Sequence, residues 1–241
     1  MLLFMLPLLS HANFVVPNRN SFTDKWILTA GIGTAISFND IKQNKIFPAK
    51  NSKKSEWRPA GLLQLEREII NSIRLRGTLL ICQLSGFLQE ENQYFEADVT
   101  ETSISVSADL FGLFLPGLSE KGFKLAINTG AGLCFYYSSR QNLLTGQILV
   151  HRGQSKGFGL SGKMMEGIVI AGITLAYSID QHWTIQLESG HRLMNADNME
   201  SLTGGFPFDS YNIVNLGVSY KIFNEWNYPI VNKNIYKKLN R

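Results

Sequence analysis

The chain has 241 residues, of which 44% are hydrophobic and only 17% are charged. This balance excludes a disordered tail or a collagen-like fibre. After the first nine residues, no apolar stretch approaches the roughly 18 residues that a membrane helix needs. The net charge of +4 would suit nucleic-acid binding. However, the basic residues gather in expected loops and ends without interleaved aromatic residues, so we expect no nucleic-acid partner.

The chain begins with a short apolar segment, MLLFMLPLL, followed by Ser10, His11 and Ala12. An apolar core with a small-x-small sequence after it is typical of an export signal, so we expect a signal peptide over residues 1–12. A buried N-terminal strand or helix is the alternative. No cysteine stands just beyond the expected cleavage site, which argues against a lipid-anchored protein.

Alternation of large apolar with small or polar residues dominates the rest of the chain. The segments Trp26–Phe38 and Phe123–Phe135 keep this period of two over about thirteen residues, which predicts long strands. The same criterion predicts eight strands, at residues 26–38, 57–68, 72–86, 95–110, 123–135, 161–179, 183–194 and 211–223. Helical periodicity competes only over residues 62–73, where alternation then resumes.

The links between these strands alternate in length. Those after the first, third, fifth and seventh strands are long, about 18, 8, 25 and 16 residues, and the others are about 3, 10 and 3. Asn71 and the pair Asp180-Gln181 supply turn chemistry for the tight links. The pattern favours an antiparallel meander across a bilayer, with short turns and both chain ends in the periplasm.

Eight alternating strands fit either a soluble ligand-binding barrel with apolar residues inside or an outer-membrane barrel with apolar residues outside. The less apolar face is rich in Gly, Ala, Ser, Thr and Asn, which suits a crowded lumen better than a solvated exterior. We therefore predict an all-β, eight-stranded, antiparallel, up-and-down transmembrane β-barrel over residues 25–223, with a short basic tail at 224–241. The soluble, lipocalin-like binder is an alternative.

Charged residues of the strands fall on the inward parity, because a lipid-facing Arg or Lys at mid-bilayer would cost roughly 2–4 kcal/mol. Arg67 is an exception that can reach lipid headgroups beside a turn. Folding the second hairpin places Glu66 opposite Arg74, and Glu166 is expected near Arg192. Paired charges would plug the narrow lumen of an eight-stranded barrel and leave no conducting path. The expected interior polar cluster comprises Glu66, Arg74, Arg76, Glu166, Glu188 and Arg192, and the further inward charges are Asp109, Lys124 and Lys221.

Aromatic residues gather near the strand ends, as in the girdles at membrane interfaces, although core packing is an alternative. Cys82 and Cys134 are the only cysteines. Their strands are separated by a third, about 10 Å apart, so we expect small packing residues and no disulfide. The girdle candidates are Trp26, Trp57, Phe95, Phe123, Phe135, Tyr177, Trp183, Tyr211, Tyr220 and Phe223.

Three stretches together resemble the OmpA-like outer-membrane β-barrel proteins of Bacteroidetes-type bacteria. They are SIRLRGTLLICQLSGF (72–87), YFEADV (94–99) and MEGIVIAGITLAYSIDQHWTIQLESGHRLMNAD (165–197). The resemblance spans residues 26–223 and implies a bacterial outer-membrane location and contact with the outer-membrane assembly machinery. In that family the last strand carries an assembly signal, which Asn215, Gly217, Tyr220 and Ile222 match. The tail is too short for the peptidoglycan-binding domain of the larger relatives.

Enzymatic chemistry has one candidate. Ser189 and His191 share a strand face where lipid A could reach them, but Glu188 points to the opposite face and leaves no orienting acid. A lipid-modifying enzyme is thus only an alternative, and we expect no enzyme activity, cofactor or metal. We expect a monomer with a structural or surface-interaction role, in contact with lipid and lipopolysaccharide. Lys50, Lys53 and Lys54 are candidates for binding lipopolysaccharide phosphates, whereas His151 and Arg152 are expected to be solvated.

Overall fold

The structure is a computed structural model that describes residues 25–38, 41, 55–70, 72–195, 199 and 208–223. The expected signal peptide, the basic tail, Asn71 and the three candidate lysines Lys50, Lys53 and Lys54 lie outside these residues. The chain divides into the unit Lys25–Ile222, which holds the barrel, and a second unit of Met1–Asp24 with Phe223–Arg241.

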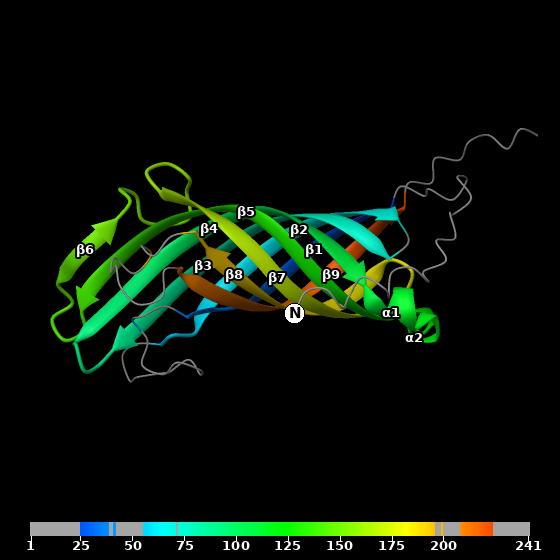
Figure 1. The fold of residues 1–241 in the computed structure, drawn as a ribbon, viewed down its shortest axis with the longest axis horizontal. Helices are drawn as coiled ribbons and strands as arrows, with labels where there is room; N and C mark the ends of the chain where they lie inside the picture. Colours follow the sequence, from blue (N-terminus) through cyan, green and yellow to red (C-terminus); the bar gives the residue numbers. More distant parts are fainter. Residues whose placement is uncertain are drawn as a thin grey trace, which may run out of the picture. The chain divides into compact units, whose positions relative to one another are not determined.

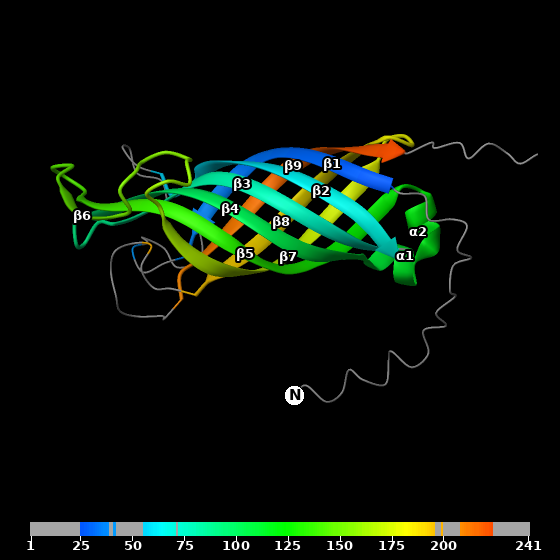
Figure 2. The ribbon, with the colours of Figure 1, turned by 90° about the horizontal axis from the view of Figure 1, so that it is seen from above.

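Eight long antiparallel strands close into a barrel (Figures 1 and 2). Consecutive barrel strands pair with each other, and β1 pairs with β9, so the ring has no open edge. This closure satisfies the backbone hydrogen bonds that a bilayer could not satisfy. The barrel strands are β1 (Lys25–Ser37), β2 (Arg58–Ile70), β3 (Ile73–Leu88), β4 (Gln93–Asp109), β5 (Phe123–Asn142), β7 (Met164–Ser178), β8 (Trp183–Met194) and β9 (Ser210–Phe223).

The two ends of the barrel differ in their connections. The loop end carries the links at residues 38–57, 89–92, 143–163 and 195–209, and the turn end carries those at 71–72, 110–122 and 179–182. The link at 143–163 contains a ninth strand, β6 (Ile148–Arg152), which pairs with β5 and lies at the far end from the helices in both views (Figures 1 and 2).

Two short helices form the link between β4 and β5 at the turn end. Helix α1 (Leu110–Phe114) starts where the Asp109 carboxylate accepts a hydrogen bond of 3.1 Å from the backbone N–H of Phe111. Helix α2 (Pro116–Glu120) starts with a proline, which suits the first helical turn. Within the described residues, no helix has the length and hydrophobicity needed to cross a membrane.

The predicted architecture of eight antiparallel strands is confirmed, with differences at the strand ends. Strand β5 continues to Asn142 instead of ending at Phe135, while β7 begins at Met164 and not at Ser161. Strand β6 and the two helices were not predicted. The end of β5 could not be predicted, because its sequence lacks the alternation of apolar and polar residues. Ser138 and Ser139 point to opposite faces of the strand, yet both are polar and both are buried.

Large apolar side chains lie on the outside of the barrel. In β8 exposed and buried residues alternate strictly, with Ile185 and Leu187 exposed while Gln186 and Glu188 are buried. Ile32 is 77% exposed and Ile104 is 65% exposed. The outward face of β8, apolar except at Ser189 and His191, extends over about 11 residues, the length that a tilted strand needs to cross the hydrocarbon. The barrel is therefore of the membrane type, and the soluble alternative with an apolar interior facing a polar exterior is wrong.

The aromatic girdle is clear at the turn end. Phe123 packs on Tyr177, and Trp183 packs on Tyr220, each pair with ring centroids 4.9 Å apart. The Arg67 guanidinium lies 5.3 Å from the centroid of the Trp26 ring on the same outer surface, which suits its expected place near headgroups. Two other girdle assignments are wrong: Phe95 and Tyr211 are fully buried inside the barrel, because their parity matches the inward residues of β4 and β9.

Candidate functional site in the barrel interior

An ion-pair network crosses the barrel interior. Glu66 on β2 pairs with Arg74 at 3.1 Å and with Arg76 at 2.7 Å, so the predicted Glu66–Arg74 pair is confirmed. Arg76 on β3 also reaches across the lumen to Glu188 on β8 at 2.9 Å. Glu66, Arg76 and Glu188 are all buried. Two carboxylates thus share one guanidinium, an arrangement that satisfies charges which would be costly if left alone.

Neutral partners complete the hydrogen bonds of Glu188. The Gln64 amide donates to Glu188 Oε2 at 3.2 Å, and the Thr174 hydroxyl donates to it at 3.3 Å. The Gln64 side-chain oxygen in turn accepts a hydrogen bond from Gln186. Because strands β2, β3, β7 and β8 all contribute, the network ties together opposite walls of the barrel.

Arg192 forms a second buried cluster with a partner that we did not predict. Its Nε donates to Glu101 Oε2 at 3.2 Å, and the Tyr211 hydroxyl donates to the same oxygen at 2.9 Å. The expected proximity of Glu166 to Arg192 is wrong, since the Cα partner of Arg192 on β7 is Ile170. Glu101 lies on the same face of β4 as Asp109, because an even number of residues separates the two. This spacing predicts that Glu101 faces the lumen.

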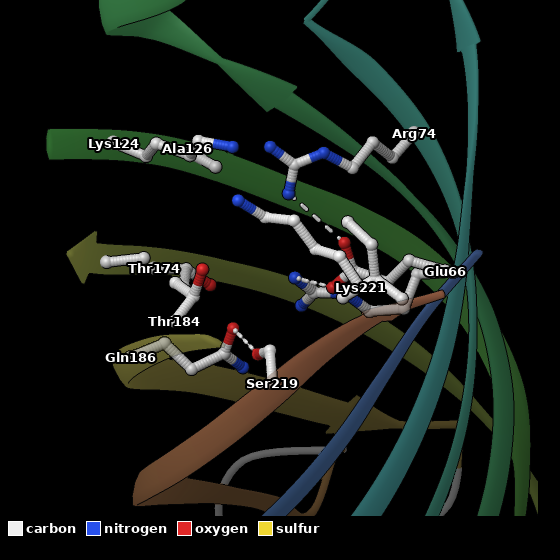
Figure 3. A pocket seen from close by; sticks show the side chains of 12 residues that line it. Glu66, Arg74, Lys124, Ala126, Thr174, Thr184, Gln186, Ser219 and Lys221 are labelled. Atoms are coloured by element: carbon white, nitrogen blue, oxygen red, sulfur yellow. Dashed lines mark hydrogen bonds and ion pairs between the residues drawn. The ribbon is translucent and has the colours of Figure 1, made fainter. Parts of the chain in front are cut away.

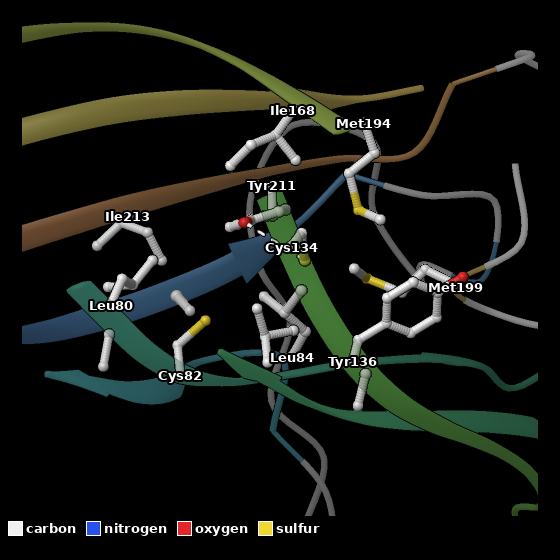
Figure 4. Packing of buried hydrophobic residues seen from close by; sticks show 14 of the residues in the cluster. Leu80, Cys82, Leu84, Cys134, Tyr136, Ile168, Met194, Met199, Tyr211 and Ile213 are labelled. Carbon is white, nitrogen blue, oxygen red and sulfur yellow. Dashed lines mark hydrogen bonds between the residues drawn. The ribbon is translucent and has the colours of Figure 1, made fainter. Parts of the chain in front are cut away.

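Apart from the buried Arg192–Glu101 pair, the loop half of the interior is mainly apolar instead of polar (Figure 4). The predicted small, polar lumen is therefore correct only for the turn half. Cys82 and Cys134 are free thiols buried in this apolar cluster, as expected of packing residues. The cluster, here called the apolar plug, comprises residues 35, 41, 60, 62, 80, 82, 84, 95, 97, 99, 134, 136, 168, 170, 194, 199, 211 and 213.

A small pocket, with a cavity volume of about 20 Å³, lies at the turn end of the lumen (Figure 3). Its lining brings together Arg74 on β3, Lys124 on β5 and Lys221 on β9. Among the described residues of the lining, the network carboxylate Glu66 is the only acidic one. The Lys221 ammonium lies 3.3 Å from the Ser178 hydroxyl. We call this space the turn-end pocket; its other lining residues are Ile27, Arg76, Ala126, Thr174, Ala176, Thr184, Gln186 and Ser219.

The link between β6 and β7 folds back on the outer face of the barrel at the loop end. The backbone N–H of Gly157 donates to Asp98 at 2.8 Å, and the Thr100 hydroxyl donates to the Phe158 carbonyl at 3.0 Å. Lys163 donates to the Gly157 carbonyl and lies 5.7 Å from the centroid of the Tyr137 ring. Partial burial of Lys163 lowers the pKa of its ammonium. We call residues 153–163 the rim segment.

Ser189 and His191 lie on the outer face of β8, and the described residues form no catalytic site around them. Ser189 accepts a hydrogen bond of 3.4 Å from the Asn212 amide, and His191 packs edge-on against Phe38. Glu188 faces the lumen and is held by Arg76, so it cannot orient the imidazole. Among the described residues, no group of three or more His, Cys, Asp or Glu side chains is placed to hold a metal ion.

The predicted assembly-signal residues occupy both faces of β9. Tyr220 and Ile222 are exposed at the turn end, whereas Asn215 is buried opposite Glu188. Gly217 faces the lumen, where an added Cβ would lie 3.2 Å from the Thr29 side chain. The motif therefore presents its aromatic and apolar members outward.

No protein-family model and no curated protein sequence matches the chain. Solved structures similar to it include Neisserial surface protein A, with 12% identity, 82% of this chain and 97% of that chain covered, and a TM-score of 0.44. The attachment invasion locus protein Ail of Yersinia pestis has 12% identity, coverage of 83% and 99%, and a TM-score of 0.45. The outer membrane protein OprG from Pseudomonas aeruginosa has 10% identity, coverage of 83% and 97%, and a TM-score of 0.45. This likeness concerns the fold alone.

Proposed function

We propose that the protein is an integral, monomeric barrel of a bacterial outer membrane with a structural or surface-interaction role and no open pore. One observation carries this proposal: the outer surface is apolar over the length of a membrane strand, while side chains fill the lumen except for a small pocket at its turn end. Closed barrels of this kind are found in outer membranes. The OmpA-like type, which the sequence resembles, is the finer assignment within this proposal.

The proposed absence of a pore is supported by the way side chains fill the lumen. The apolar plug occupies its loop half, and ion pairs join β2, β3 and β8 below it. An eight-stranded barrel is only wide enough for its own side chains. Current recordings across planar bilayers should therefore show no discrete openings for the folded protein, with a larger porin as the positive control. Stepwise conductance by the folded barrel would contradict this part of the proposal.

The surface-interaction role is supported by the hairpin of β5 and β6. Strand β6 pairs with β5 alone, so its other edge is open among the described residues. Ile148 is 54% exposed and Leu149 50%. An open edge with apolar side chains suits contact with another chain, because both the backbone and the side chains can bind.

The rim segment supports contact with lipopolysaccharide. Phe158 and Leu160 are exposed in this segment. Lys156, which comes just before them in the sequence, is exposed as well. Apolar residues beside an ammonium suit the boundary between acyl chains and phosphates. Unfolding in bilayers with and without lipopolysaccharide tests this point. The variant Lys156→Gln should lose part of the lipopolysaccharide-dependent stabilisation, whereas Lys121→Gln, at the opposite end, should keep it.

Delivery to the membrane would use the assembly machinery that recognises the last strand. The outward Tyr220 and Ile222 are accessible for such recognition. Assembly in vesicles that contain the purified machinery should slow for Tyr220→Ala, while spontaneous insertion without the machinery should change less. Equal slowing in both assays would show that Tyr220 acts only through barrel stability.

We propose no enzyme activity. Glu188, the carboxylate next to the Ser189 and His191 pair in sequence, is committed to Arg76 in the lumen. The lipid-modifying alternative predicts that lipid A mass spectra differ between cells with the wild-type protein and cells with Ser189→Ala. We expect identical spectra, and a missing acyl-chain modification in the variant would overturn this assignment.

A further inference from the structure

The link between β4 and β5 exposes a cluster of large apolar side chains at the turn end of the barrel. Phe114 is 75% exposed, and Leu113, Leu115 and Leu118 are exposed as well. Neither α1 nor α2 contains a buried residue. Single apolar side chains are common on surfaces in water, whereas a contiguous cluster marks a surface that contacts another molecule or a membrane.

This link also lacks charge. Residues 110–119 contain no Asp, Glu, Lys or Arg, and the first charged residues are Glu120 and Lys121 at its end. The link at residues 179–182 of the same barrel end is different, because Asp180 accepts hydrogen bonds from the backbone across that turn. The β4–β5 link is therefore not built like a turn that lies in water.

The β4–β5 link continues into the lipid-facing surface of the barrel. Both views show its helices at the turn end (Figures 1 and 2). Gly122, with a φ of 88°, connects the end of α2 to Phe123, the girdle residue that packs on Tyr177. Among the described residues, none from either helix lines the turn-end pocket. The apolar side chains of the link thus lie next to the level at which aromatic residues mark a membrane interface.

We propose that residues 110–120, here called the interface link, insert into the boundary between lipid headgroups and acyl chains at the turn end. A lipid surface is therefore the partner of this link. Short helical segments with exposed Phe and Leu bind at this boundary, and they bury their apolar face about 5–10 Å deep. The proposal rests on the proposed function in one respect, because the leaflet concerned is the periplasmic one only in the proposed orientation.

Lipid fits this surface better than a second protein does. The barrel already lies in the bilayer, so the lipids around Phe123 are adjacent to the link. The uncharged sequence of residues 110–119 provides no charged side chain that would give a protein partner specificity. Inserted in this way, the interface link would fix the depth of the turn end in the membrane.

The test measures the depth of fluorescent labels in the full-length protein, folded in lipid bilayer discs whose two surfaces are both open to solution. Single cysteines at Phe114→Cys and Leu118→Cys carry an NBD fluorophore, which iodide quenches from water and nitroxide-labelled lipids quench from the bilayer. Leu144→Cys is the matched control, because Leu144 is 78% exposed but lies at the loop end. Leu187→Cys, on the outer face of β8, is the positive control for lipid contact.

We expect the labels at Phe114→Cys and Leu118→Cys to lie about 5–10 Å below the bilayer surface and to be quenched weakly by iodide. The label at Leu144→Cys should be quenched strongly by iodide and little by nitroxide-labelled lipids. Wild-type protein treated in the same way measures the background from Cys82 and Cys134. A shift in gel mobility on heating confirms that each labelled barrel is folded, and the two positions in different helices allow the test if one variant does not fold.

Equal quenching by iodide at Phe114→Cys and Leu144→Cys would overturn the proposal, and a periplasmic protein would then be the better partner. Protection of Phe114→Cys that appears only in discs with two barrels would assign the link to a second copy of the chain, which also overturns it. If the label at Leu187→Cys contacts lipid in these cases, the membrane barrel stands and only the interface link fails. Iodide access at Leu187→Cys would instead contradict the proposed function itself.

Discussion

Replacement of Arg76 by methionine should destabilise the barrel more than replacement of any outward arginine. Arg76 is 2% exposed and forms ion pairs of 2.7 Å with Glu66 and 2.9 Å with Glu188. Removing one partner of a buried pair costs about 3–5 kcal/mol, because the remaining charge is left unpaired. Glu66 keeps Arg74, and Glu188 keeps the Gln64 amide. We therefore expect a loss near the lower limit, about 3 kcal/mol.

The assay is urea unfolding in lipid vesicles, followed by tryptophan fluorescence. Arg67→Met is the matched control, since Arg67 lies outside over Trp26 and its loss should cost about 0.5–1 kcal/mol. In a double-mutant cycle, Arg76→Met and Glu188→Gln should together cost at least about 1 kcal/mol less than the sum of the single changes. If Arg76→Met costs no more than Arg67→Met, or if the cycle is additive, the charge network does not stabilise the barrel as argued.

Three further results are expected. Gly132→Ala should lower stability by about 1–3 kcal/mol in urea unfolding, because its Cβ would lie 2.4 Å from the Thr102 carbonyl, whereas Gly167→Ala, with open space at its Cβ, should be tolerated. Both thiols, Cys82 and Cys134, should resist a maleimide reagent in the folded protein and react after unfolding; labelling of the native barrel would contradict their burial. Hydrogen bonds from the N–H groups of Trp183 and His182 hold the pKa of the Asp180 carboxyl below its usual range. The stability that Asp180→Ala removes should therefore be present at neutral pH and disappear as the pH falls through that lowered pKa; a difference that persists in strong acid would show that the carboxylate charge is not involved.

The sequence was sufficient to predict the eight barrel strands and the face on which most of their residues lie. Alternation in β8 gives the outward position of Leu187 and the inward position of Glu188 directly. Turn chemistry at Asp180 is also confirmed, because its carboxylate accepts hydrogen bonds from the backbone across the turn. Such features are local, and each depends on residues that are close in sequence.

Contacts across the lumen could not be predicted in the same way. The pairing of Arg76 with Glu188 joins β3 to β8, and it depends on the stagger of all the strands between them. The alternation of residues predicts which face of a strand a residue occupies, but not its position along the barrel axis. It therefore could not predict that the apolar plug and the ion-pair network occupy different halves of the lumen. The error at Glu166 was avoidable, since the tight turn at residues 179–182 fixes Ile170 opposite Arg192.

The central claim, that the barrel turns large apolar side chains toward lipid and its buried ion pairs toward the lumen, is tested most directly by spin labels placed one at a time along β8. Collision of each label with oxygen dissolved in the bilayer measures its exposure to lipid. The structure predicts high values at Ile185, Leu187 and Ser189 and low values at Gln186 and Gly190. A reversed alternation, or equal values along the strand, would contradict the account.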